Sequence, residues 1–572
     1  MNRYGMYSRT FVIFFVAILF SSCFFSSSNN AEDNVKLIPV ITDDRGDFAS
    51  DVFIRVNQMG FKKSELKTAV VLTKKDMGGK KFIVKDIKSG KDVFEAKIPP
   101  SVAGWGSFNF CHIIDFTGLG AEGTFVIDVE GNRSSNFRIG ESVYSSIVDS
   151  LLLFFKVQRC GATNPFLHKV CHIYDSPTVV GDDRAGKIDV TGGWHDAGDF
   201  TKFLNTTAFS TYMLLFSYEF NPKRMEFDKN KDGAPDVLEE ARVGLDLLLR
   251  MNYQPSKLII QVQDRRDQTV GWRLPENDTL KFDRPAFAGM GKNLIGIYAA
   301  AMAMGSRIWK DRFQDAAFAD KLLKAANNVF ALRNSAPDLD TNPIGLYQDS
   351  KYEGKLALGA IEMYITTGKV QYLEEAKKLA KSADSDYWWS WGNINSLAQY
   401  RVAKYSMDMK QYIENNLAAF NESRKKNPFG EGTAFSWGTT HTFLGIALQS
   451  ILFRDLTKSS LYDSVASYQR DYVLGKNPWG VSFIYNIGSR STRNFHSQVG
   501  FFNNGYLPGA VAAGPVPAEI LKGYNIQRTN FIYDRFNSPE VKYYDDRQDY
   551  ITNEPTIVSN ATAVFVFSHF YR

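Results

Sequence analysis

The chain has 572 residues, which is long for one ordinary domain and predicts a smaller domain joined to a larger one. Hydrophobic residues make up 44% of it, as in globular proteins, and the aromatic share of 14% indicates surfaces that stack on flat ligands. The net charge is only +5, and no basic stripe is interleaved with aromatic residues. This charge pattern excludes nucleic acid as an expected partner.

The N-terminus has the features of an export signal. Arg3 and Arg9 precede an apolar run over residues 11–20. This run is too short to cross a bilayer but has the length of a signal-peptide core. We therefore expect a signal peptide over residues 1–22.

A lipid anchor is expected directly after that signal. The run ends in Leu-Phe-Ser-Ser-Cys, which resembles a bacterial lipobox with Cys23 as the lipidated residue, and a polar tether follows over residues 23–50. Simple secretion with cleavage near Ser22 is the alternative. The lipobox predicts an exported lipoprotein bound to a membrane, and we expect the outer membrane and the cell surface, with a periplasm-facing enzyme as the alternative.

The next segment has the pattern of an all-β domain. Short alternating runs extend from Phe53 to Ile139 and are separated by Gly, Asn and Asp at spacings typical of a sandwich. After Tyr144 the apolar period becomes helical. We divide the chain at this change into a β-sandwich over residues 51–140 and a helical domain over residues 141–572.

The helical domain shows about twelve apolar-periodic segments. They lie near residues 142–158, 205–220, 235–252, 291–308, 314–333, 355–367, 371–382, 386–403, 408–421, 438–455, 459–474 and 556–570. Long irregular stretches at 160–204, 253–290 and 475–553 separate some of them, and loops of this length are more often functional than idle. Twelve helices predict six hairpins closed into a toroid with these loops on one face. A helical solenoid is the alternative, but the chain lacks a fixed-period repeat.

Two aspartates in a glycine-rich segment are the first candidate catalytic residues. The segment Gly-Gly-Trp-His-Asp-Ala-Gly-Asp-Phe carries Asp196 and Asp199, with Gly198 between them. Gly198 permits a close backbone turn, so the two acids can converge on one point and together orient a water molecule. A turn that caps the following helix is the ordinary alternative.

A third carboxylate precedes the last helix. Glu554 lies in Tyr-Ile-Thr-Asn-Glu-Pro-Thr, where an acid often only compensates the helix dipole. Cleavage of a glycosidic bond, however, requires one protonated carboxyl on the leaving oxygen and one carboxylate that activates water. Asp199 and Glu554 supply that pair if the fold brings them together.

Several ordered blocks resemble glycoside hydrolase family 9, the cellulases and related β-glucanases with an N-terminal immunoglobulin-like module. These blocks are IRVNQMGF, FFKVQRCG, GGWHDAGDFTKF, GAPDVLEEAR, FSWGTTHT, DYVLGKNPWGVSFI and DYITNEPTIVSNA. The resemblance implies an immunoglobulin-like sandwich followed by an (α/α)6 barrel, and an inverting mechanism. It implies that Asp199 is the general base, Asp196 its partner in holding the water, and Glu554 the general acid. In inverting enzymes the two carboxyls lie about 6.5–9.5 Å apart.

The expected activity is an endo-β-1,4-glucanase acting on cellulose-like, mixed-linkage or xyloglucan chains, as a monomer without an organic cofactor. An exo-acting relative that releases glucose, cellobiose or glucosamine is the first alternative. A surface lipoprotein that binds glycan without cutting it is the second, and such a protein has no need of three placed carboxylates.

One block departs from the family pattern. Where the family often carries His-His-Arg in contact with sugar, this chain has Arg-Asn-Phe-His-Ser-Gln. We expect His496 and Gln498 to bind substrate, although Gln498 lacks the charge and forked geometry of arginine. A loop histidine without a ligand is the alternative.

Four residues have the inventory of a closed structural zinc site: Cys160, Cys171, His172 and His195. Some family members with the immunoglobulin-like module hold zinc with these residue types. Zinc here would fix the catalytic loop to the first helix. A Cys160–Cys171 disulfide is the alternative.

A second metal is suggested by the segment Asp-Lys-Asn-Lys-Asp-Gly, which matches a calcium-loop pattern. Its candidate ligands are Asp228, Asn230, Asp232 and Glu239. A plain helix N-terminus that begins at Pro235 explains the pattern equally well. Five tryptophans near loops are candidate sugar platforms, although core packing explains most tryptophans: Trp388, Trp389, Trp391, Trp437 and Trp479.

Overall fold

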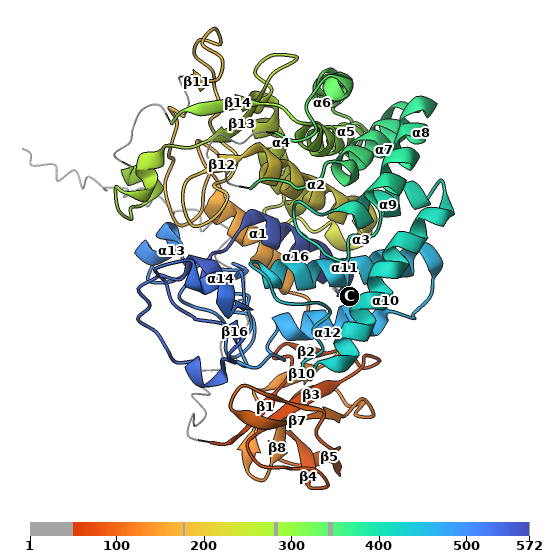
Figure 1. The fold of residues 1–572 in the computed structure, drawn as a ribbon, viewed down its shortest axis with the longest axis vertical. Coiled ribbons are helices and arrows are strands. Elements are labelled where there is room, and N and C mark those ends of the chain that lie inside the picture. Colours follow the sequence, from red (N-terminus) through yellow and green to blue (C-terminus); the bar gives the residue numbers. More distant parts are fainter. Residues whose placement is uncertain (1–49, 176–177, 279–283, 341–346, 571–572) are drawn as a thin grey trace, which may run out of the picture.

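The structure is a computed structural model that describes residues 50–175, 178–278, 284–340 and 347–570. A β-sandwich lies at one end of the molecule and a helical barrel forms the rest (Figure 1). The predicted lipid site at Cys23 lies outside the described residues. None of the described helices is both long enough and apolar enough to cross a membrane.

The sandwich consists of two sheets with strand orders β1-β3-β7-β6 and β2-β10-β8-β4-β5, with β9 on β8. The strands are β1 Val52–Arg55, β2 Gly60–Phe61, β3 Thr68–Thr73, β4 Lys81–Asp86, β5 Asp92–Lys97, β6 Ala103–Trp105, β7 Phe108–Asp115, β8 Gly123–Val129, β9 Asn132–Arg133 and β10 Phe137–Ile139. Strand β3 is buried on both faces. Because side chains alternate along a strand, Ala69 and Val71 enter the core between the sheets, whereas Val70 and Leu72 join the core of the barrel.

Twelve helices of the described chain form two concentric rings, alternating between outer and inner positions along the sequence. The outer helices are α1 Ile147–Gln158, α4 Asp236–Met251, α6 Ala316–Phe330, α8 Val370–Ala383, α10 Lys410–Lys426 and α12 Asp463–Val473. The inner helices are α2 Leu204–Phe220, α5 Lys292–Phe313, α7 Glu353–Thr367, α9 Asn395–Ala403, α11 Thr439–Thr457 and α16 Ile557–Phe570. Each inner helix contacts the next, and α16 closes the ring on α2. This arrangement is the predicted (α/α)6 barrel.

Burial explains which helices lie inside. In the inner helix α2 every residue from Leu204 to Ser217 is buried, whereas in the outer helix α6 the buried residues repeat at helical spacing from Phe318 to Val329. A helix that is apolar all round is stable only when it is surrounded, and an amphipathic helix packs with one face outward.

All twelve predicted helices are present, and the largest difference in a boundary is at the start of α9. The segment predicted as helical from residue 386 begins its helix only at Asn395. A turn occupies the intervening residues, where Ser390 Oγ accepts hydrogen bonds from the backbone N–H groups of Gly392 and Asn393. The apolar pattern of this segment came from tryptophans in a loop.

The long loops hold elements that periodicity did not predict. A small sheet of order β11-β14-β13-β12 comprises Val179–Val180, Ala286–Gly289, Leu258–Val262 and Lys202–Phe203. The remaining short elements are α3 Pro222–Met225, α13 Gln498–Phe502, β15 Val516–Pro517, α14 Ala518–Lys522, β16 Val541–Lys542 and α15 Tyr550–Asn553.

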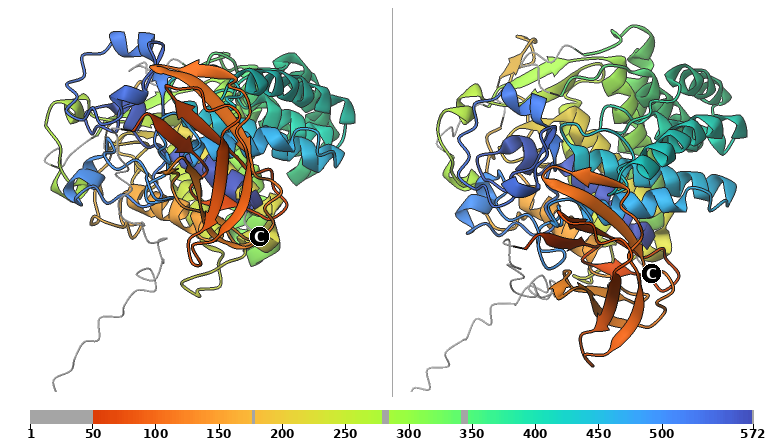
Figure 2. Two further views of the ribbon diagram at one scale, coloured as in Figure 1. Left: turned by 90° about the horizontal axis from the view of Figure 1, so that it is seen from below. Right: turned by 60° about the horizontal axis from the view of Figure 1, so that its bottom comes forward.

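The sandwich packs against the segment 475–553, which follows α12 (Figure 2). Trp105 Nε1 donates to Phe536 O at 2.7 Å, and Arg55 Nε donates to Pro478 O at 3.0 Å. The same segment carries His496, so the sandwich supports one side of the candidate site.

Candidate active site

The loop that leads into α2 brings two distant parts of the chain into contact. A Cβ atom on Gly198 would lie 2.0 Å from His496 O and 3.2 Å from Glu554 Oε1. The Gly198 N–H donates to Glu554 Oε1 at 3.1 Å. Glycine is required here because two other segments approach its backbone closely, which no side chain would permit.

Asp196 is a buried carboxyl group. It is 1% exposed, and neither of its oxygens forms a hydrogen bond of normal geometry within the described chain. Burial raises its pKa to about 6, with a further contribution from Asp199, against the opposing effect of the nearby Thr206 and Tyr347 hydroxyls. A buried carboxyl with uncommitted oxygens is an acceptor for a water molecule or a hydroxyl group.

Asp199 is half-buried and is oriented by a residue two positions away. Its Oδ1 accepts from the Thr201 N–H at 3.0 Å, and its Oδ2 accepts from Thr201 Oγ1 at 3.0 Å. Each oxygen keeps a second lone pair, so the carboxylate can be held in position and still accept a proton.

Glu554 lies between α15 and α16. Asp549 caps α15 by accepting from the Ile551 and Thr552 N–H groups, each at 3.1 Å, and the Ile557 N–H donates to Asp196 O at 3.0 Å. Burial and the negative charge of Asp199 raise the pKa of Glu554 well above its ordinary value. A carboxyl that keeps its proton beside an acceptor carboxylate is the pairing of general acid and general base.

The structure brings the three predicted carboxyl groups together from segments more than 350 positions apart in sequence. The electrostatic coupling of Glu554 to both Asp199 and Asp196 reflects that proximity. Their assignment as acid, base and partner remains a prediction.

His496 lies in the wall of this site. Its Nδ1 lies 2.9 Å from Arg547 O, which makes Nδ1 the protonated nitrogen and leaves Nε2 as an acceptor. Its ring packs edge-on against Trp272 at 5.0 Å and against Tyr550 at 5.6 Å. Burial lowers the pKa of His496, so the ring is neutral at pH 7.

Gln498 holds the loops together. It is 5% exposed, and its Oε1 accepts from the Arg273 N–H at 3.0 Å. The backbone N–H of Gln498 donates to Gly198 O at 3.1 Å. Where the family pattern has an arginine near the sugar, this glutamine ties two loops to the catalytic segment. Its role in substrate binding stays a prediction.

Three aromatic residues at the site were missed. Tyr347 lies beside Asp196, and its ring packs against Trp391 at 5.2 Å. Trp272 and Tyr550 flank His496. Long irregular stretches were the only sequence signal for Tyr347 and Trp272, whereas Tyr550 also lies in the block around Glu554 that resembles the family.

Of the five candidate tryptophan platforms, two are fully buried and three, Trp388, Trp391 and Trp437, are partly or well exposed. Trp389 and Trp479 are 0% exposed and belong to the core. Trp437 is 44% exposed, and its ring contacts Tyr524 and Tyr550. Only the second kind can offer a face to a sugar ring.

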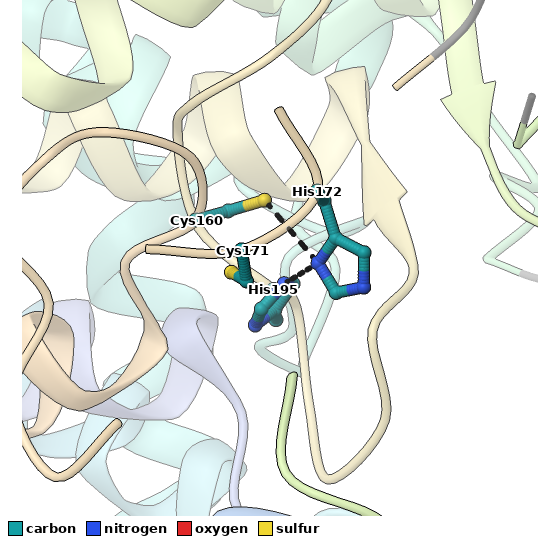
Figure 3. A group of neighbouring side chains, drawn as sticks. All are labelled: Cys160, Cys171, His172 and His195. Carbon is teal, nitrogen blue, oxygen red and sulfur yellow. Dashed lines mark hydrogen bonds between the residues drawn. The ribbon is translucent and has the colours of Figure 1, made fainter. Parts of the chain in front are cut away.

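The four predicted zinc ligands form one cluster beside the catalytic loop (Figure 3). The donor atoms of Cys160, Cys171, His172 and His195 all lie within 4.8 Å of one another. His172 Nδ1 lies 3.1 Å from His195 Nε2 and 3.8 Å from Cys160 Sγ. The edges of a tetrahedron with normal zinc–sulfur and zinc–nitrogen bonds measure about 3.3–3.8 Å. Two sulfurs and two imidazoles in this spacing fit a tetrahedral metal.

Cys160 and His195 have the protonation tendencies of metal ligands. Cys160 and Cys171 are free rather than joined in the alternative disulfide. Burial lowers the pKa of His195 to about 4, which leaves the ring neutral and able to bind a metal. Burial opposes ionisation of Cys160, but contact with Cys171 and the Lys202 charge outweigh it and lower the Cys160 pKa. Contact with Cys160 and burial raise the pKa of Cys171. Burial opposes protonation of His172, but its hydrogen bonds to Asp278 and Cys160 outweigh it and raise the His172 pKa.

Two of the predicted calcium ligands accept hydrogen bonds within their own loop. Asp228 Oδ1 and Oδ2 accept from the Lys231 and Gly233 N–H groups at 2.6 and 2.8 Å. Asp232 Oδ1 accepts from the Ala234 N–H at 2.9 Å. The carboxylates thus serve the turns of their own loop. Among the described residues, the only group of three or more potential metal-binding side chains is the cysteine–histidine cluster.

Three carboxyl groups gathered at the loops of an (α/α)6 barrel fit a glycoside hydrolase. The profile of glycosyl hydrolase family 9 matches residues 144–567, and that of the cellulase N-terminal ig-like domain matches residues 50–134. The chain belongs to glycoside hydrolase family 9, and it is an enzyme of the cellulase type.

Relatives of known activity and structure span most of the chain. It is 26% identical to a xyloglucan-specific endo-β-1,4-glucanase of Bacteroides ovatus, over 90% of this chain and 93% of that protein. It is 24% identical to a cellodextrinase of Butyrivibrio fibrisolvens, over 90% and 99%. A metagenome-derived family 9 endoglucanase superposes with a TM-score of 0.79 at 28% identity, covering 91% of this chain and 99% of that one. A Zn-binding triple mutant of family 9 endoglucanase J30 gives 0.78 at 25% identity, covering 89% and 99%.

Proposed function

We propose that this enzyme is an inverting endo-β-1,4-glucanase that cuts soluble β-glucan chains. The observation that carries the proposal is the contact between Glu554 and the Gly198 N–H, which joins a carboxyl of raised pKa to the loop of Asp196 and Asp199. One carboxyl thus holds a proton while its neighbours accept one.

The mechanism follows from these environments. Glu554 donates its proton to the glycosidic oxygen as the bond breaks. Asp199 accepts a proton from the attacking water, which Asp196 helps to orient through its uncommitted oxygens. Water attacks the face opposite the leaving group, so a β bond yields an α product.

The test is Glu554→Gln on two substrates. On natural glucans we expect a loss of about 10²–10⁴-fold in kcat, because the leaving sugar alkoxide needs a proton that glutamine cannot supply. An aryl β-glucoside or cellobioside with an activated leaving group departs without protonation and should be far less affected. Nuclear magnetic resonance of early product should show the α anomer. Equal losses on both substrates, or β product first, would contradict the assigned roles.

Endo action on xyloglucan, mixed-linkage glucan or a cellulose-like chain is supported by the endoglucanases among the relatives, one of them xyloglucan-specific. Exo action is the second candidate, since one relative is named a cellodextrinase and another a cellulose 1,4-β-cellobiosidase. Viscosity loss that precedes the release of reducing ends separates endo from exo cleavage.

We propose zinc as the metal of the Cys160, Cys171, His172 and His195 cluster. The mixed sulfur and nitrogen donors, and a Zn-binding neighbour among solved family 9 structures, support it. A closed four-ligand site supplies structural rigidity and leaves no open position for substrate. Protein purified without added metal should contain about one zinc per chain, and both thiols should react after denaturation with a chelator. A Cys160–Cys171 cross-link in a zinc-free protein would refute this.

Calcium at Asp228, Asn230, Asp232 and Glu239 stays a prediction from the sequence, since the carboxylates of Asp228 and Asp232 already accept from backbone N–H groups. Export as a monomeric lipoprotein anchored at Cys23 also stays a prediction, with the cell surface as the proposed location. Cys23→Ala should release the enzyme from membranes or leave its precursor uncut. Full protection from protease on intact cells would place the enzyme in the periplasm instead.

A further inference from the structure

Four buried charges occupy the segment between β13 and β14. Asp267, Arg273, Asp278 and Arg284 are each at most 8% exposed. Asp267 Oδ1 accepts from Arg273 Nη2 at 2.6 Å and from Arg284 Nη2 at 2.9 Å. Asp278 accepts from both arginines as well, with Arg273 Nε at 2.7 Å from its Oδ1. Two acids and two bases neutralise one another, so each charge is paired in a site that excludes water.

This network contacts the metal cluster. Asp278 Oδ2 lies 3.0 Å from His172 Nε2. His172 directs its other nitrogen, Nδ1, at His195 and Cys160. With the proton on Nε2, His172 donates to Asp278 and keeps the Nδ1 lone pair for the metal. A carboxylate in this position commonly fixes the tautomer and ring orientation of a metal-binding histidine.

The network also holds the residue after the general base. Arg284 Nη1 donates to Phe200 O at 3.1 Å. The guanidinium carbons of Arg273 and Arg284 lie 5.0 and 5.4 Å from the centre of the Phe200 ring. That ring packs against His172 and His195 at 5.1 and 5.2 Å. Phe200 therefore contacts the metal ligands and the arginines at once.

A third contact reaches the segment that carries His496 and Gln498. The backbone N–H of Arg273 donates to Gln498 Oε1, and the backbone N–H of Gln498 donates to Gly198 O. The N–H of Gly198 in turn donates to Glu554 Oε1. The neighbouring Trp272 packs edge-on against His496 at 5.0 Å. The loop that carries the charges is thus joined to both sides of the catalytic centre.

We propose that Asp278 is a positioning residue that couples the metal cluster to the catalytic loop and to the segment of His496 and Gln498, so that metal and β-glucan strengthen each other's binding. The inference rests on the proposed function for its sugar ligand. A bound metal fixes His172, and His172 fixes Asp278. Asp278 in turn holds the two arginines that position Phe200 and the Trp272–Gln498 wall. Coupling between two sites is reciprocal: each ligand must raise the affinity of the other by the same factor.

The experiment measures zinc affinity by chelator competition in the Glu554→Gln holoprotein, with and without a β-1,4-linked glucose tetrasaccharide. We expect the tetrasaccharide to tighten zinc binding at least about fivefold, and removal of zinc to weaken tetrasaccharide binding by that same factor. In cobalt-substituted protein, the visible absorption spectrum should shift when the sugar binds. A purely structural metal would give neither effect.

Asp278→Asn in the same background should weaken zinc about 10–100-fold and abolish the effect of the sugar on zinc and on the cobalt spectrum. Asp264→Asn is the matched control. Asp264 lies in the same loop and pairs with an arginine, Arg266, whose side chain is 53% exposed. This control should keep both the affinity and the coupling.

The outcomes separate the two proposals. The coupling is overturned if Asp278→Asn leaves the zinc affinity unchanged. It is also overturned if saturating tetrasaccharide leaves the zinc affinity of the holoprotein unchanged. The measurement on the parent holoprotein needs no Asp278 variant, so poor folding of that variant does not leave the idea untested. If the tetrasaccharide fails to bind the holoprotein, the proposed substrate is wrong, while the comparison of zinc affinities still decides whether Asp278 supports the metal site.

Discussion

Two acidic, glycine-containing segments of this enzyme look alike in sequence and differ in structure. The segment around Asp196 and Asp199 leaves the Asp196 carboxyl buried without a hydrogen bond of normal geometry in the described chain. In the exposed segment around Asp228, both carboxylate oxygens accept N–H groups from residues three and five positions ahead. Acid spacing alone does not distinguish the two.

The difference lies in what surrounds each loop. A carboxylate in water satisfies local N–H groups and stabilises its own turn. The catalytic loop is instead covered by distant segments, since His496 and Glu554 pack against Gly198. Burial without a committed partner destabilises the fold locally and leaves the group available for chemistry.

The largest expected effect is on activity. Asp199→Asn should reduce kcat by about 10²–10⁴-fold on every substrate, including activated aryl glycosides, because water attack lacks its base. Asp228→Asn should leave kcat within a factor of about two. Initial rates on a natural glucan and on an aryl glycoside measure both variants. An active Asp199→Asn enzyme would assign the base elsewhere.

Much of the fold follows from local sequence patterns. Outer helices are apolar on one face with a 3.6-residue period, and inner helices such as α2 are apolar nearly all round, so both kinds could be predicted. The loop before Asn395 could not be predicted, because Trp388 and Trp389 give it an apolar pattern like that of a helix. The β11–β14 sheet has strands of two to five residues, too short for any period to appear.

The carboxyl groups of the site could be predicted from the sequence, but the aromatic residues around them could not. Asp196, Asp199 and Glu554 lie in blocks that resemble the family. Tyr347 and Trp272 reach the site through loops whose paths depend on long-range contacts, such as Arg273 with Gln498. A sequence pattern carries no information on which side of a loop faces the catalytic carboxyl groups.

A second prediction concerns stability, where the catalytic loop should behave in an unusual way. Burial raises the pKa of Asp196 from 3.8 to about 6, so the folded state binds this proton more tightly than the unfolded state does. Ionisation therefore lowers the free energy of unfolding as the pH rises from about 4 to about 6, and the full cost persists above that range. Asp196→Asn removes the charge. It should be inactive yet more stable than the parent at pH 7, by up to about 3 kcal/mol.

Thermal unfolding of both proteins at pH 4 and pH 7 checks this prediction, with zinc content held equal. The gain should shrink towards zero at pH 4, where the parent carboxyl is protonated in the folded state. A variant that is less stable than the parent at pH 7 would show that Asp196 is held by interactions that favour its charge.

The smallest expected effect has the opposite sign and belongs to the other segment. Asp228→Ala removes the acceptors of two backbone N–H groups, at Lys231 and Gly233, in a loop open to water. Because water can replace those acceptors, the loss in free energy of unfolding should be about 0.5–1.5 kcal/mol, with kcat unchanged. Urea unfolding with and without added calcium measures it. If Asp228 only accepts the N–H groups of its own turn, the loss in free energy of unfolding is the same with and without calcium. The contrary result is that calcium stabilises the parent enzyme and does not stabilise the Asp228→Ala variant. It would show that Asp228 can leave its N–H partners to bind the ion. The two segments would then share the ability to free a carboxylate for a ligand.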